Sequence, residues 1–186
     1  MKKPFLYFLT LPVLILWVGL ACSLSGGPTP PREINISPEL AQSVASSVQT
    51  AQPDPTTGKL QFTITEDQMT SYVVYNLRQD FEPLLNNPVI VFQPDRIELY
   101  GTIQGDSITA NGRVVMSINI NGQGEPSVKI IEANFGPIPI PAGLLDNLST
   151  VIDHSLTDGM SNQNTGYQMD SILITTGSAT ITLRKK

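Results

Sequence analysis

Alternation of apolar and polar residues over positions 88–135 is the feature that most constrains the fold of this 186-residue chain. In the run ITANGRVVMSINI, residues 108–120, every second position from Ile108 to Ile120 is apolar or glycine. A period of two places successive side chains on opposite faces, which is typical of a β-strand with one buried face. Similar runs surround it, with turn residues such as Gly105-Asp106 between them. The sequence therefore predicts an antiparallel meander with one apolar and one polar face.

Capping and breaking residues around the meander predict helices and further strands. Ser37 is a suitable N-cap for a helix that should end before Pro53. Thr65 and Gln68 form the capping-box pattern of a second helix, and a third is expected over residues 141–158. The expected fold is α+β: one curved antiparallel β-sheet of six to seven strands packed around two long helices, with an N-terminal helix. Alternation marks the remaining strands at 59–65, 167–175 and 178–185.

An uncharged apolar run, residues 4–21, follows two lysines and ends at Cys22, the single cysteine of the chain. A positive start followed by an apolar stretch is typical of a secretory signal. This N-terminus resembles bacterial lipoprotein signals, in which a small residue precedes an invariant cysteine. Ala21 fits that position, whereas Gly19 stands where the family prefers leucine. The resemblance implies that residues 1–21 are a lipoprotein signal peptide and that Cys22 is lipidated as the mature N-terminus.

Two other interpretations of this segment stay open. Residues 4–21 can just span about 30 Å of hydrocarbon as a retained anchor. The signal can also be removed so that the chain is released. Lipidation and anchoring give the same topology, in which the chain is attached to the membrane on the extracytoplasmic side of the cell envelope.

Composition divides the rest of the chain into a tether and a domain. Residues 22–36 are rich in small residues and proline and predict a flexible tether, and residues 37–186 form the expected α+β domain. Loss of Lys2 and Lys3 with the signal changes the net charge from −5 to −7. A surface of this charge does not hold nucleic acid or anionic lipid by electrostatics alone.

Few residues suggest catalysis. His154, the one histidine, has polar neighbours by helical phase on the third helix, as expected of a solvated side chain. Glu66 and Asp67 fall in the first turn of the second helix, where acidic residues stabilise the helix dipole. The sequence has no Cys-x-x-Cys pair, phosphate-binding loop or nucleophile elbow. We therefore expect a protein that is not an enzyme and uses no cofactor or metal.

The apolar stripes of the second and third helices permit two outcomes. Gly101 and Gly112 lie on the apolar face of the meander and favour a sheet that curls around these helices. The helices then either complete a filled core or leave an apolar groove for a lipid or another apolar ligand. The candidate groove residues share the two stripes: Met69, Val73, Leu77, Leu144, Leu148 and Ile152.

Residues 59–184 resemble small bacterial lipoproteins related to the tubular lipid-binding superfamily. The likeness depends most on the passage NFGPIPIPAGLLDNL, residues 134–148, together with the lipoprotein signal. It implies a non-enzymatic, membrane-tethered protein that binds lipid at the cell envelope. The alternative is a structural or adaptor lipoprotein that docks a protein partner through the helix at 141–158.

Overall fold

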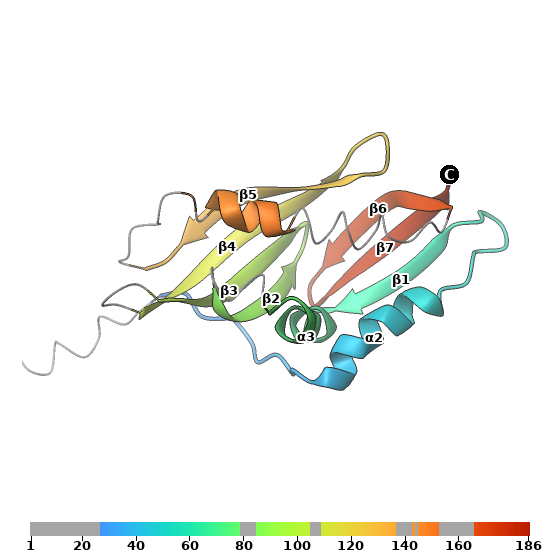
Figure 1. Cartoon of the computed structure of the whole chain (residues 1–186). Helices are drawn as coiled ribbons and strands as arrows, with labels where there is room; N and C mark the ends of the chain where they lie inside the picture. The colour runs from blue at the N-terminus through green and yellow to red at the C-terminus, as the bar shows by residue number, and fades with distance from the viewer. Residues whose placement is uncertain (1–26, 79–84, 105–108, 137–142, 144, 153–165) are drawn as a thin grey trace, which may run out of the picture.

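The computed structural model describes residues 27–78, 85–104, 109–136, 143, 145–152 and 166–186 (Figure 1). Two helices have defined bounds, α2 at Pro38–Gln49 and α3 at Glu66–Asn76, and residues 145–152 are also helical. Seven strands complete the fold: β1 Leu60–Thr65, β2 Asn86–Gln93, β3 Arg96–Gln104, β4 Thr109–Ile120, β5 Pro126–Asn134, β6 Tyr167–Thr175 and β7 Ser178–Lys185.

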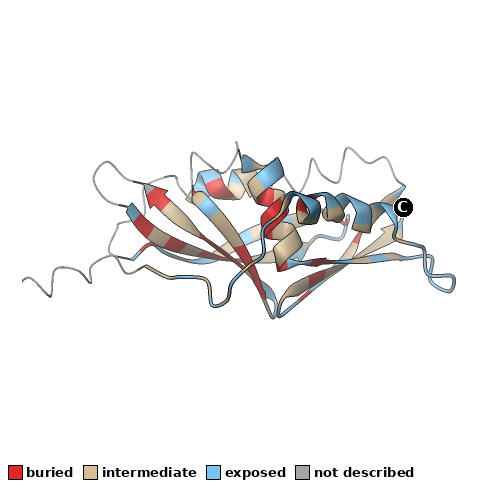
Figure 2. Cartoon of the chain, turned by 90° about the horizontal axis from the view of Figure 1, so that it is seen from below, coloured by how far each residue is buried: buried red, intermediate tan, exposed pale blue. Residues whose placement is uncertain are grey.

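The strands form two antiparallel sheets, with strand orders β1-β7-β6 and β2-β3-β4-β5. Viewed from below, the sheets diverge from a common line, and the helices lie on the concave side between them (Figure 2). The predicted α+β class is confirmed, but the prediction of one sheet curved around two long helices is wrong.

The two sheets are separate because side chains of α3 hydrogen-bond to the outer edge of β2, where a strand of the other sheet would have to pair. The Thr70 hydroxyl donates to the carbonyl oxygen of Ile90 at 3.2 Å and accepts from its N–H at 2.9 Å. Glu66 Oε2 accepts from the N–H of Phe92 at 3.2 Å. Residues four apart on a helix rise about 6 Å and residues two apart on a strand about 6.8 Å, so the two spacings match. The helix thus satisfies backbone groups that a further strand would otherwise bond.

The two sheets are joined where their hairpin turns meet. The N–H of Asp95, in the β2–β3 turn, donates to the carbonyl of Ile174 at 3.2 Å. The N–H of Gly177, in the β6–β7 turn, donates to the carbonyl of Phe92 at 3.2 Å. The first residue of α3 bonds to the same turn, from Glu66 N–H to Gly177 O at 3.1 Å. These bonds fix α3 in the angle between the sheets.

One hydrophobic core fills this angle and includes both glycine positions of the meander. Gly101 and Gly112 face each other across β3 and β4. A methyl group built on Gly112 would lie 2.0 Å from Phe135 Cδ1, and one on Gly101 would lie 2.4 Å from Leu85 Cγ. Both glycines therefore make room for a large buried side chain. The other buried members of the core are Val73, Ile90, Phe92, Leu99, Ile103, Val114, Met116, Leu148, Ile174 and Ala179.

The predicted element boundaries are mostly confirmed. Ser37 caps α2 by accepting from the N–H of Leu40 at 3.2 Å. Thr65 and Gln68 form the expected capping box of α3. All seven strands lie where alternation predicts them. Residues 145–152 are helical within the predicted third helix.

Candidate functional site

The predicted groove residues that the structure describes belong to the hydrophobic core. Val73 is 3% exposed and Leu148 is 2% exposed. Met69, Leu77 and Ile152 are partly buried and pack against the same core. Two other predicted site residues, Leu144 and Cys22, lie outside the described residues. The structure thus brings five of the six groove candidates into one apolar cluster, and their role in ligand binding stays a prediction.

A surface cavity of about 550 Å³ lies between the C-terminal part of α3 and the start of β2. Its apolar wall consists of Ile36, Val74, Leu85, Pro88 and Val89. Its polar lining consists of Arg78, Asn86, Asn87, Thr102 and Thr109, and Arg78 is the one charged residue of the described lining. A volume in this range is typical of small-molecule sites, and here apolar and polar residues contribute equally to the lining.

A β-bulge in β2 opens this cavity. Asn86 pairs with Thr102 and Val89 pairs with Tyr100, so two residues of β2 have no partner of their own on β3. Asn87 has φ 50°, a left-handed conformation that asparagine tolerates better than most residues. Pro88 has no backbone N–H, which suits an edge strand at a bulge. The bulge turns the start of β2 away from regular pairing, and Leu85 fills the hollow over the glycine behind it.

Residues 27–36, named here the strap, cross the outer face of the four-stranded sheet from β4 to β2. At one end, Gly27 lies against the backbone of Asn111 on β4. At the other end, Arg32 Nη2 donates to the carbonyl of Phe92 on β2 at 3.1 Å. A second hollow of about 610 Å³ lies between residues 30–35 and Val89. The described part of the predicted tether therefore lies against the domain.

Three sets of hydrogen bonds fasten the strap and its junction with α2 to α3. The guanidinium of Arg32 bonds both carboxylate oxygens of Glu66, a residue only 7% exposed. The side chain of Asn35 donates to Asp67 at 3.2 Å, and its N–H donates to the same carboxylate at 3.3 Å. The N–H of Ser37 donates to the Ser71 hydroxyl at 3.1 Å. The hydrogen bond to Glu66 raises the pKa of Arg32, so the guanidinium stays charged over the physiological range.

Beneath the strap, the outer face of the sheet carries a buried polar group. Glu98 is 4% exposed and accepts from the Tyr100 hydroxyl at 2.7 Å and from Arg96 Nε at 3.1 Å. Burial raises the pKa of Tyr100, and the hydrogen bond to Glu98 raises it further. On the neighbouring strand, Arg113 donates to Glu132 at 2.5 Å. Glu98, Tyr100 and Arg96 satisfy one another, which is the usual arrangement of structural polar side chains on a covered sheet face. Among the described residues, the Nε of Arg113 is buried without a hydrogen-bond partner.

No family model, curated protein or solved structure matches this chain. Within the described residues, no group of histidine, cysteine, aspartate or glutamate has the arrangement of a metal site. In that same part of the chain, no helix is both long enough and apolar enough to span a membrane. His154 lies outside the described residues.

Sequence reasoning missed the residues that line the cavity. Residues 86–88, Asn-Asn-Pro, directly precede the alternating run of β2. Asparagine in a left-handed conformation followed by proline is a signal for an irregular strand start. This signal indicates a bulge, but it does not say which helix lies beside it. The pairing of Arg32 with Glu66 also had no local signal, since 34 residues separate the two.

Proposed function

We propose that this chain is a non-enzymatic lipoprotein, attached to the membrane through a lipid on Cys22, with its domain on the extracytoplasmic side of the cell envelope. We further propose that the domain binds an amphiphilic ligand in the cavity between α3 and β2. The observation that carries this proposal is the composition of the cavity lining, which combines an apolar wall with four uncharged polar side chains and one arginine. An amphiphile with an apolar body and a polar head fits such a lining.

The adaptor hypothesis has less support from the described residues. It requires an exposed apolar strip on the helix at 141–158. Within residues 145–152, Leu148 is buried, and Leu145, Val151 and Ile152 pack against the core. Leu148 is thus part of the core, and the partly buried Leu145, Val151 and Ile152 direct apolar surface toward it.

The lipid attachment is tested by changing Cys22 to alanine in cells supplied with a labelled fatty acid. We expect the wild-type protein to take up label and to fractionate with membranes, and the variant to take up none, because the thiol is the attachment point. An unlabelled wild-type protein that retains residues 1–21 would instead indicate a membrane anchor. An unlabelled, soluble wild-type protein would contradict both forms of attachment.

The ligand site is tested with Val74→Trp in a soluble form that begins at residue 23 and so keeps the strap. The indole should fill the cavity, because Val74 is one of its wall residues. We expect binding of a fluorescent fatty acid to weaken by at least about tenfold, a loss of about 1.4 kcal/mol, with an unchanged melting temperature. The measurement is a fluorescence titration beside a thermal melt.

Tyr75→Trp is the matched control, because Tyr75 is adjacent on α3, is 51% exposed and is not part of the described lining. It should bind the probe as the wild-type protein does. Equal binding by both variants would exclude the cavity as the site. A wild-type domain that binds no amphiphile would contradict the ligand proposal itself.

A further inference from the structure

The two ends of the domain lie at different distances from Cys22, the proposed point of attachment. We propose that the strap holds the domain end-on, so that the end of the four-stranded sheet around Thr102, Thr109 and Asn111 rests on the bilayer surface. The three-stranded sheet then points away from the membrane. This inference rests on the proposed attachment at Cys22 and adds to it the surface that meets the lipid.

The first argument is the length of chain between Cys22 and the strap. Gly27, the first described residue, already lies against Asn111 at the start of β4. Five residue steps reach at most about 17 Å. If the strap were free as far as Ser37, fifteen steps would reach about 50 Å. The attachment point is therefore three times closer to the domain than a free segment of residues 22–36 would allow.

The second argument is where this end lies in the molecule. The strap begins at the opposite end of the molecule from the C terminus (Figure 1). From Asn111 to Ile120, β4 spans nine residue steps, about 30 Å. The β4–β5 turn at residues 121–125 is therefore farther from Gly27 than the short link can reach. The end near Gly27 is the one that the link keeps at the membrane.

The orientation has a consequence for the ligand. Thr102 and Thr109 belong both to the end near the strap and to the lining of the cavity. In the proposed orientation, the cavity lies close to the bilayer surface. An amphiphile can then pass between bilayer and cavity without crossing much water, so the source of the ligand is the membrane that holds the Cys22 lipid.

The experiment compares two labels on the full-length lipidated protein. Thr109→Cys and Gln123→Cys each introduce an exposed thiol, one at each end, whereas the thiol of Cys22 is consumed by the lipid. Each variant carries a fluorophore and is reconstituted into phosphatidylethanolamine–phosphatidylglycerol vesicles with a spin-labelled headgroup lipid. We expect several-fold stronger quenching at position 109 than at position 123.

A third protein has a ten-residue Gly/Ser insertion between residues 26 and 27, which lengthens the link and leaves every described contact intact. In this protein the two positions should be quenched to similar, low extents. Equal quenching in the original protein, or a preference that survives the insertion, would overturn the orientation by the strap. Vesicle flotation separates this failure from failure of the proposed function, because a protein that does not float with the vesicles has no attachment at all.

Discussion

Replacing Glu66 with alanine is expected to lower the free energy of unfolding by about 1–3 kcal/mol, since it leaves the partners of a partly buried carboxylate unsatisfied. The Glu66 side chain is 10% exposed and that of Arg32 is 31% exposed. The change leaves the Arg32 guanidinium without its carboxylate and the N–H of Phe92 without its acceptor. The change also removes one of the two α3 side chains that hydrogen-bond to the edge of β2. Urea denaturation followed by circular dichroism measures the loss.

An exposed ion pair supplies the control for this prediction. Lys59 and Asp170 are 2.7 Å apart, and the lysine side chain is 46% exposed. Because exposed pairs contribute about 0–1 kcal/mol, Lys59→Ala should change stability little. Arg32→Ala should resemble Glu66→Ala, and the double variant should cost less than the sum of the two. Single variants that lose no more stability than Lys59→Ala would show that the strap is not fastened by this pair.

Local sequence signals predicted the helices and strands because each signal acts over a few residues. The capping box of Thr65 and Gln68 spans one helical turn, and the alternation in β4 reports directly which side chains face the core. Such patterns depend only on the roughly 3.6-residue period of the helix and the two-residue period of the strand, so they can be recognised in a short stretch of sequence. They do not indicate which strands pair with each other.

The division into two sheets could not be predicted for that reason. Glu66 fits an ordinary acidic residue in the first turn of a helix, and its position gives no sign of a bond to Phe92. Thr70 likewise reads as a polar residue on a helix, although it is fully buried and bonds both backbone groups of Ile90. These contacts join residues 20 and 26 positions apart. A prediction from alternation therefore assigned all strands to a single sheet.

The strap shows the same limit for the candidate site. Composition correctly marks residues 27–36 as lacking helix or strand periodicity, and the structure has none there. Lack of periodicity, however, does not exclude contact with the domain. Arg32 is an isolated charge in a proline-rich stretch, and only the folded arrangement brings it to the buried Glu66. Ile36, the last residue of the strap, lines the cavity together with residues of α3 and β2, and this grouping likewise has no local sequence signal.

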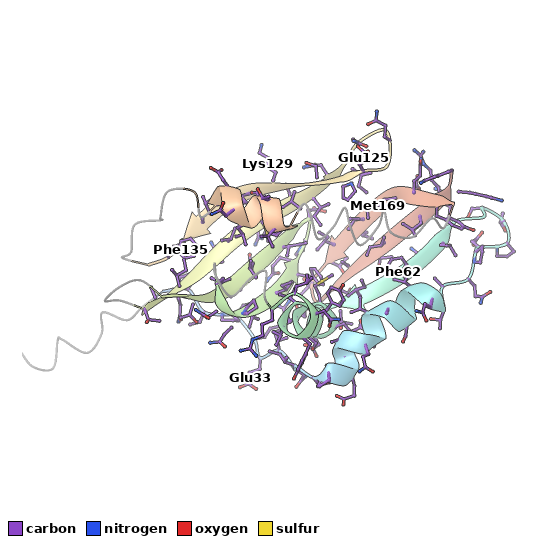
Figure 3. All side chains as sticks on the ribbon, viewed as in Figure 1. Glu33, Phe62, Glu125, Lys129, Phe135 and Met169 are labelled. Carbon is purple, nitrogen blue, oxygen red and sulfur yellow. The ribbon has the colours of Figure 1, made fainter. Side chains whose placement is uncertain are left out.

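The second large effect is expected at Phe135, where alanine should cost about 3–5 kcal/mol. Phe135 is 2% exposed and follows the end of β5 (Figure 3). Its ring occupies the space over Gly112, where no other side chain can stand. Removal of the ring leaves a cavity over a glycine, and the paired strands β3 and β4 hold that backbone in place. Phe62→Ala is the matched control and should cost less, because the half-buried Phe62 lies on β1 outside the described core cluster.

Gly112→Ala makes the same contact testable from the other side. In the wild-type background the added methyl would meet the ring at 2.0 Å, and overpacking of this kind typically costs about 1–3 kcal/mol. In the Phe135→Ala background the methyl enters empty space, so Gly112→Ala should cost little or should restore some stability. Thermal and urea unfolding of the four proteins measures this coupling. Additive effects would mean that the ring does not lie over the glycine, and the interpretation of Gly112 as a residue chosen for close packing would fail.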